Sequence, residues 1–187
     1  MKVLFIGNSM HSLPEEFEKK GCEALVCNNN TDMRIIDNTV KKFKPNLIVV
    51  SGLGSIKNSG NSIDAIRSYY EKIPIFGVGL GYLCIINVFE GKVDKIQPMF
   101  GKPLKIKHDG KTIFNKIENP FQAGSYSSLA AVDVPYIFEV SARDENDIVM
   151  GVRHKEHFVE GIQFDPASIL TPAGGKIIEN LINGIKK

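Results

Sequence analysis

The feature that most constrains the fold is an apolar run that ends in three closely spaced glycines. Residues 74–78 (PIFGV) are a short apolar segment, which is typical of a strand buried on both faces. Gly77, Gly79 and Gly81 permit a sharp reversal, and residues 82–89 then have the character of a helix. A strand, a tight turn and a helix whose positive end faces the turn predict a nucleophile elbow with Gly79 at its apex. Because Gly79 has no side chain, the scaffold for nucleophilic chemistry is predicted without its nucleophile.

Apolar runs alternate with helical segments over the first half of the chain. Strands are expected at residues 3–6, 24–26 and 46–51, and helices at 12–21 and 37–43. The first helix would start with a Ser-x-x-Glu capping box at residues 12–15, and Pro45 would end the second. This order predicts an α/β fold, with an open, mostly parallel sheet and helices on both faces. Ligands of such sheets bind beyond the carboxyl ends of the strands, where the loop 51–55 and the elbow emerge.

After residue 90 the pattern changes to short alternating pieces broken by glycine and proline. We expect a small antiparallel excursion there, with strands at 103–107, 112–114, 136–142, 148–154 and 158–164. A last helix should begin with Thr171 as its N-cap and Pro172 at its first position. Its core face would carry five apolar residues, namely Ile177, Ile178, Leu181, Ile182 and Ile185. With no repeat or linker in the pattern, residues 1–187 are predicted to form a single domain.

Composition excludes several functional classes. The 187 residues suit one domain with a substantial core. A net charge of +2 with scattered basic residues argues against a nucleic-acid surface, and the basic cluster at 41–44 is interpreted as a solvated helix end. No apolar run approaches the ~18 residues of a membrane span, and residues 1–6 suit a first strand better than a signal peptide. We therefore expect no nucleic-acid partner and no membrane partner.

The cysteines indicate a reduced compartment and do not indicate a metal site. Cys22, Cys27 and Cys84 are an odd number without metal-ligand spacing. A reduced, cytoplasmic setting is the direct interpretation. The sequence predicts no cofactor and no metal.

Six motifs follow one another along the chain, at 74–81 (PIFGVGLG), 99–102 (MFGK), 108–110 (HDG), 125–129 (SYSSL), 148–155 (IVMGVRHK) and 161–171 (GIQFDPASILT). Each motif is weak alone, but the ordered set is specific and covers essentially the whole chain. The set resembles that of class I glutamine amidotransferases, most closely the small subunit of anthranilate synthase and its aminodeoxychorismate synthase relative. The resemblance implies the flavodoxin-like fold of that family.

The resemblance also implies a chemistry whose three catalytic residues are missing. The family uses a Cys thiolate at the elbow to attack the glutamine amide, a His to move the proton, and a Glu to orient the His. Carried over position by position, these residues fall on Gly79, Asp165 and Ala167. The catalytic triad is therefore replaced, and no catalytic residue of the family is intact.

Further departures lie around the implied glutamine pocket. Leu83 stands where the family has a polar residue, usually Gln, and Ser127 stands at a His of the family. The oxyanion loop of the family is replaced around Leu53. The ligand pocket implied by the resemblance comprises Gly52, Leu53, Gly54, Leu80, Leu83, Ser127 and Ser128.

Other residues are poor substitutes for the missing triad. Cys84 lies five residues after the apex, about one and a half helical turns away, and should point into the core. The histidines are expected at the surface or in supporting positions, and no His is placed to activate Ser51 or Ser55. The histidines are His11, His108, His154 and His157.

Three functional hypotheses follow. The first is a pseudoenzyme of tryptophan-biosynthesis type, without glutaminase activity, that is a structural or regulatory partner of a large, chorismate-utilising synthase subunit. The second is a stand-alone protein that binds a glutamine-like small molecule in the vacated pocket. The third, ranked lowest, is an enzyme of different chemistry that uses Asp165 and nearby serines.

Overall fold

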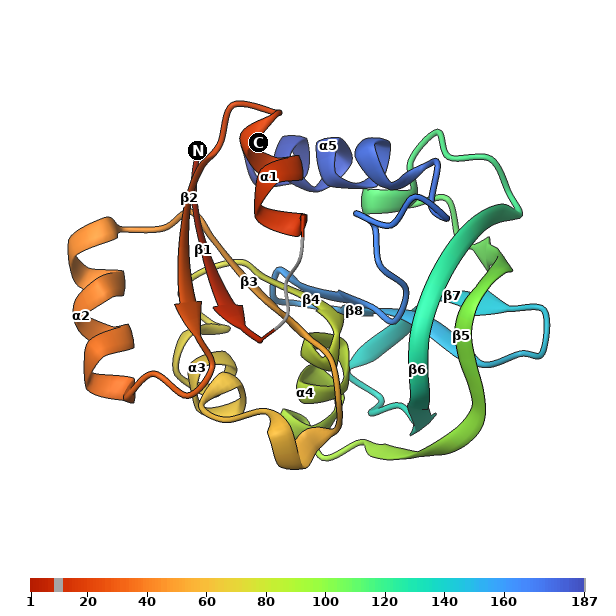
Figure 1. Ribbon diagram of the computed structural model, residues 1–187, viewed down its shortest axis with the longest axis horizontal. Helices are drawn as coiled ribbons and strands as arrows, with labels where there is room; N and C mark the ends of the chain where they lie inside the picture. The colour runs from red at the N-terminus through yellow and green to blue at the C-terminus, as the bar shows by residue number, and fades with distance from the viewer. Residues whose placement is uncertain (9–11, 187) are drawn as a thin grey trace.

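A nine-stranded mixed sheet runs through the computed structural model, which describes residues 1–8 and 12–186, apart from the side chains of 99–102 (Figure 1). The strand order is β2-β1-β3-β4-β9-β8-β6-β5-β7. Helices cover both faces of the sheet (Figure 1). The predicted α/β fold is thereby confirmed.

The parallel part of the sheet positions the elbow. Its strands are β1 (Lys2–Gly7), β2 (Glu23–Asn28), β3 (Leu47–Gly52), β4 (Ile75–Gly79) and β9 (Val159–Ile162). All six residues of β3 are buried, because the strand lies between two neighbours and beneath helices on both faces. The register pairs Gly52 with Gly79, so the loops after β3 and β4 leave the sheet side by side.

The antiparallel part is larger than the sequence pattern predicts. It contains β5 (Lys92–His108), β6 (Phe121–Asp133), β7 (Phe138–Asp144) and β8 (Val149–His154). Bulges divide the 17 residues of β5 into short stretches, which breaks the alternation that reveals a long strand. The strand expected at 112–114 is wrong: this segment is the 3₁₀ helix η2 (Thr112–Phe114). The backbone N–H groups of Phe114 and Asn115 donate to the carbonyl oxygens three residues before them, at 2.8 and 3.2 Å, which closes a 3₁₀ turn instead of pairing with a strand.

The helices form one layer on each side of the sheet. On one side α1 (Leu13–Glu18) and α5 (Gly174–Ile185) pack in one hydrophobic cluster. On the other side α2 (Met33–Phe43), α3 (Ser62–Tyr69) and α4 (Leu80–Val88) pack in a second cluster. A further 3₁₀ helix, η1 (Ile56–Asn58), follows the loop after β3. The expected core residues of α5 are buried or half-buried in the first cluster.

The predicted starts of α2 and α5 need correction, and so does the predicted capping box of α1. Helix α2 begins four residues earlier than expected because the carboxylate of Asp32 accepts a hydrogen bond from the backbone N–H of Arg34 at 2.8 Å. Ser12 precedes α1 but makes no side-chain cap. Thr171 does not cap α5, because its hydroxyl is bonded to the backbone of Asp165 and Gly124, and the N-cap is Ala173.

Within residues 1–8 and 12–186, no helix has the length and apolar character needed to cross a membrane. Lys41 and Lys42 lie in the last turn of α2, as the basic cluster predicts. His11 lies outside the described residues, and the single domain stays a prediction.

Candidate functional site

The elbow has the predicted geometry. Gly79 ends β4 and is the N-cap of α4, with φ 59° and ψ −111°, a conformation that side chains rarely tolerate. A Cβ on Gly79 would lie 3.0 Å from the carbonyl oxygen of Gly52. At Gly81 a Cβ would lie 1.8 Å from the carbonyl oxygen of Val50. The helix therefore packs with its backbone almost against β3, and α4 begins at Leu80, two residues earlier than predicted.

Helix α4 is hydrophobic on all sides and lies within the core. Residues 80–86 are all buried. Tyr82, within this run, donates its hydroxyl proton to the carbonyl oxygen of Val149 at 2.9 Å. This burial fixes the helix, so the turn at Gly79 is held between rigid elements.

A cavity of about 910 Å³ opens beside the elbow, beyond the carboxyl ends of the strands. The structure brings most of the predicted site residues together in its wall. These residues are Ser51, Gly52, Leu53, Gly54, Ser55, Gly79, Leu80, Ser127, Ser128, Asp165 and Ala167. The wall also contains residues that the sequence pattern does not assign to the site, among them Asn58, Lys95, Tyr126, Gln163, Ser168 and Ile169. Gln163, Ser168 and Ile169 belong to the motif 161–171 and Tyr126 to the motif 125–129, so their place in these motifs is an available signal.

Leu83 is the exception among the predicted pocket residues. It is 1% exposed and packs in the cluster beneath the sheet instead of lining the cavity. The reason is geometric, because Leu83 lies one helical turn after Leu80, on a helix that is buried on all sides. The assignment of Leu83 to the pocket is therefore corrected.

The residues at the three triad positions cannot form a nucleophile–base pair. Gly79 offers no side-chain atom. Asp165 accepts a hydrogen bond at Oδ1 from the backbone N–H of Ala167 at 2.8 Å, and this bond shapes the turn between them. The methyl group of Ala167 packs against the hydrophobic cluster beside α5. Asp165 can accept a proton, but the apex has none to give.

Three serines of the cavity wall, Ser55, Ser127 and Ser168, form local hydrogen bonds. Ser127 donates to the carbonyl oxygen of Leu129 at 2.9 Å and accepts from its N–H at 3.0 Å. Ser55 donates to Asn58 at 3.2 Å, and Ser168 shares a hydrogen bond with Tyr126 at 2.9 Å. None of the hydrogen bonds between described residues joins a serine of the cavity to a histidine.

None of the three described histidines, His108, His154 and His157, lines the cavity. His154 is 7% exposed and so has a supporting position in the interior, one of the two placements expected for it. Its Nδ1 accepts the backbone N–H groups of Glu156 and His157, and burial lowers the pKa of its ring. His108 stacks on Phe114 with 4.9 Å between ring centres. Both rings have a structural role in the antiparallel part of the sheet.

Cys84 lies in the core, as expected. Its side chain has no exposed surface, and burial raises the pKa of its thiol to about 12. A thiol with that pKa is not a nucleophile at neutral pH. Among the described residues, no group of three His, Cys, Asp or Glu side chains is arranged to hold a metal ion.

Comparisons with known proteins match this geometry. The family model of class I glutamine amidotransferases matches residues 5–184. Anthranilate synthase component II of Haloarcula marismortui is 36% identical, over 99% of this chain and 93% of that protein. The aminodeoxychorismate/anthranilate synthase component 2 of Bacillus subtilis is 37% identical, over 88% and 86%. A crystal structure from Thermoplasma acidophilum, described as that of a GMP synthase subunit, has the same fold with a TM-score of 0.86 at 21% identity, over 100% and 94% of the two chains.

Proposed function

The chain belongs to the class I glutamine amidotransferase family, with relatives among anthranilate synthase small subunits, and we propose that it has lost glutaminase chemistry. We propose further that residues 1–187 act as one amidotransferase-like domain that serves a large, chorismate-utilising synthase subunit as a structural or regulatory partner. A reduced, cytoplasmic setting stays a prediction.

One observation carries the proposal: the elbow is intact around an apex that has no side chain. Gly79 keeps the turn at φ 59°, and Asp165 and Ala167 hold each other in a turn beside it. Amide hydrolysis through an acyl-enzyme needs a nucleophile, and in this family that atom projects from the apex. The proposal expects no hydrolysis of glutamine and no adduct with thiol-directed glutamine analogues at the elbow.

Exposed apolar side chains at the cavity mouth support a protein partner. Ile169 is 94% exposed and Leu53 is 44% exposed, and both line the cavity. Large apolar groups exposed beside a cleft mark surfaces that other proteins cover. The face beyond the strand ends is therefore the proposed docking surface for the large subunit.

The partner role is tested by co-expression with the large synthase subunit of the same cell. The wild-type chain should co-purify with that subunit, and Ile169→Glu should weaken the complex at least ~10-fold. Ile35→Glu is the matched control, because Ile35 is 56% exposed on α2, far from the cavity, and should leave the complex intact. A chain that stays monomeric in the presence of the large subunit would refute the partner role.

A second candidate function has its own supporting observation. Gln163 lines the cavity and donates from Nε2 to Leu129, but its buried Oε1 has no hydrogen-bond partner among the described residues. An unpaired buried acceptor suits a ligand that brings an N–H or O–H group, after a small shift of the side chain. A stand-alone, glutamine-binding protein would show a monomer that binds glutamine by calorimetry, whereas the first proposal expects the heteromeric complex.

A further inference from the structure

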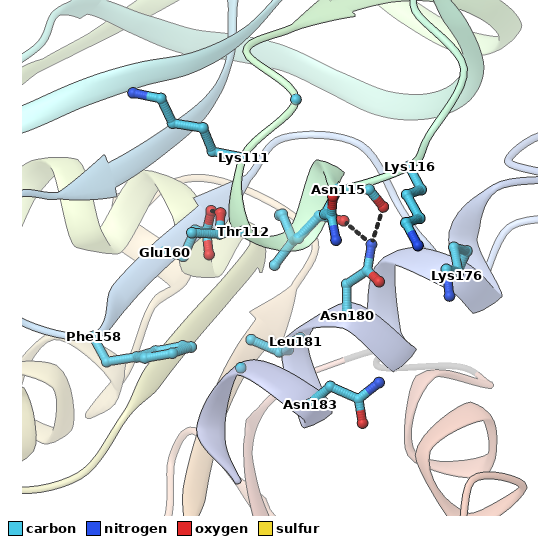
Figure 2. A pocket seen from close by; sticks show the side chains of 13 residues that line it. Lys111, Thr112, Asn115, Lys116, Phe158, Glu160, Lys176, Asn180, Leu181 and Asn183 are labelled. Atoms are coloured by element: carbon cyan, nitrogen blue, oxygen red, sulfur yellow. Dashed lines mark hydrogen bonds between the residues drawn. The ribbon is translucent and has the colours of Figure 1, made fainter. Parts of the chain in front are cut away.

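A second cavity, of about 790 Å³, lies at the other end of β9 (Figure 2). Phe158 and Glu160, at the start of this strand, line it, whereas Gln163 and Asp165, after its end, line the cavity at the elbow. The outer walls of the second cavity are the loop 110–116 and helix α5 (Figure 2). Among the described residues, none lines both cavities. The second cavity is therefore a separate site.

The loop that forms one wall is held in an unfavourable backbone conformation. Thr112 has φ 44° and Lys116 has φ 58°, in the left-handed region that a β-branched residue such as Thr rarely adopts. From α5, Asn180 donates to the carbonyl oxygens of Ile113 and Asn115 at 2.9 and 2.8 Å (Figure 2). Strain that the surroundings enforce in this way is common at ligand sites.

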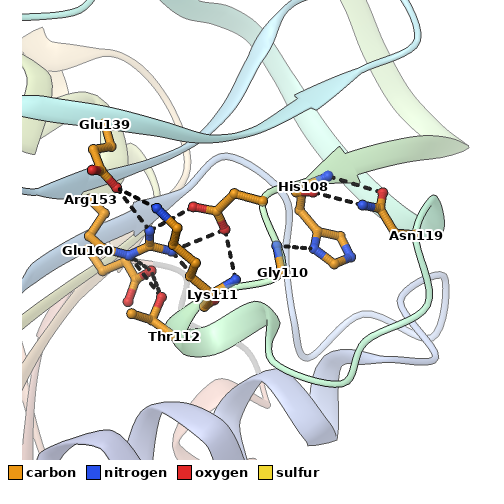
Figure 3. A network of polar contacts seen from close by, with 9 residues as sticks. His108, Gly110, Lys111, Thr112, Asn119, Glu139, Arg153 and Glu160 are labelled. Atoms are coloured by element: carbon orange, nitrogen blue, oxygen red, sulfur yellow. Dashed lines mark hydrogen bonds and ion pairs between the residues drawn. The ribbon is translucent and has the colours of Figure 1, made fainter.

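The inner end of the cavity presents a buried carboxylate with a spare oxygen. Oε1 of Glu160 accepts hydrogen bonds from Thr112 Oγ1 at 2.5 Å and from Arg153 Nε at 3.0 Å (Figure 3). The same guanidinium contacts Asp109 at 2.7 Å. Oε2 of Glu160 accepts no hydrogen bond from the residues that the structure describes. Because Glu160 is 2% exposed and lines the cavity, Oε2 is available to a donor that enters the cavity.

The outer part of the cavity is positively charged. Three exposed lysines, Lys111, Lys116 and Lys176, line it. Lys116 makes no ion pair with any described residue, while Lys176 contacts Glu179 at 3.1 Å. Lys176 also lies in the first turn of α5, where the helix dipole disfavours a cation unless an anion is near. The lysines and the helix end together favour a bound anion.

We propose that this cavity binds a ribonucleoside monophosphate. Lys116 and Lys176 would bind the phosphate. A phosphate dianion carries two negative charges and matches two ammonium groups, whereas a carboxylate ligand would carry only one. A ribose hydroxyl would donate to Oε2 of Glu160, as hydroxyl pairs do to carboxylates in nucleotide sites. The half-buried ring of Phe158, beside Leu181, offers an apolar surface for the base. The volume lies within the range of small-molecule sites.

Calorimetric titration of the full chain with AMP tests the proposal. AMP should bind with a dissociation constant below ~1 mM, and adenosine, 2′,3′-dideoxy-AMP and inorganic phosphate should each bind at least ~10-fold more weakly. Equal affinity for inorganic phosphate and AMP would overturn the nucleotide assignment. No binding of AMP at ~10 mM would overturn the site itself.

Variants locate the binding. The exposed pair Lys116→Ala and Lys176→Ala should together weaken AMP binding ~10- to 100-fold without loss of folding. Lys41→Ala, on α2 and outside this cavity, is the matched control and should bind AMP as the wild type does. Amide NMR shifts on addition of AMP should appear in residues 110–116 and 176–184. Shifts confined to the elbow, or affinity unchanged in the lysine pair, would contradict the proposal.

Discussion

Placing a cysteine at the apex is the sharpest test of how the elbow is built. In Gly79→Cys the new side chain must adopt φ 59° and ψ −111°, with its Cβ 3.0 Å from the carbonyl oxygen of Gly52. A residue in such a sparsely populated conformation costs about 1–3 kcal/mol. For a chain of this size, 1 kcal/mol lowers the melting temperature by roughly 2–4 °C. We expect the free energy of unfolding to fall by about 2 kcal/mol and the melting temperature by about 4–8 °C.

The matched control is Gly21→Cys. Gly21 also has a positive φ, 76°, but a Cβ there would meet nothing within 4 Å. Its cost should be that of a left-handed residue alone, about 1 kcal/mol. Urea denaturation of the two variants and the wild type measures both losses. Equal losses, or no loss at Gly79, would refute the argument that the turn at Gly79 is strained for a side chain.

The same variant should not hydrolyse glutamine. A thiol near its free pKa of about 8.5 is only a few per cent thiolate at neutral pH, and neither Asp165 nor Ala167 supplies an imidazole base or its orienting carboxylate. Adding Asp165→His and Ala167→Glu restores the residue types of the triad. Leu53 and Ser127 would still differ from the family in the cavity, so we expect at most weak activity from the triple variant. Turnover by Gly79→Cys alone at an ordinary rate, on the order of 10 s⁻¹, would reveal an undetected base and refute the proposed loss of function.

Three further changes test other parts of the structure. Burial raises the pKa of Glu160 to about 7 from its ordinary 4.5, so its contribution to stability is present below pH 4.5 and is lost as the pH rises through 7. As the pH rises from 5 to 8, the free energy of unfolding of the wild type should therefore fall by about 2 kcal/mol relative to that of Glu160→Gln, measured by urea denaturation. A difference between the two proteins that does not change with pH would contradict this. In the folded protein, Cys84 should react with iodoacetamide at least ~10-fold more slowly than half-buried Cys27, as measured by peptide mass spectrometry. Labelling of Cys84 that glutamine blocks would show that its burial is misjudged. Gly81→Ala should cost more than about 4 kcal/mol, because its Cβ would overlap the carbonyl oxygen of Val50, and a soluble variant with unchanged melting temperature would disprove that close packing.

The parallel strands and the elbow could be predicted from sequence because each has a strong local signal. The residues of β3 form a continuous apolar run, and the three glycines mark the turn after β4. The sequence pattern does not predict helix α3, because its eight residues are fewer than the roughly 11 over which a helical period can be counted. Residues 125–133 were not recognised as part of β6, because serines and alanines interrupt the expected alternation of large apolar residues.

At the elbow cavity, only the lining residues that lie in motifs of the family could be predicted. Ser127 and Asp165 lie in motifs of the family, whereas Lys95 reaches the cavity from an irregular part of β5. Leu83 was misplaced because a helix that is apolar on all sides gives no sign of which residues face the cavity. The second cavity could not be predicted, because its lining residues Thr112 and Glu160 meet across 48 positions of the sequence.

The close packing of the elbow also bears on how such a sequence evolves. Gly81 leaves no room for a Cβ beside Val50, whereas the apex residue Gly79 faces the open cavity and meets only one atom at 3.0 Å. Once hydrolysis is no longer selected, the apex can lose its side chain and with it the strain of the turn, whereas the neighbouring glycine is still required by the packing of α4 on β3. A protein can lose the activity and still retain the glycine pattern of the motif, because the fold requires it. In such proteins a preserved elbow motif indicates only that the helix and the strand still pack closely, and the identity of the apex residue indicates whether the reaction is possible.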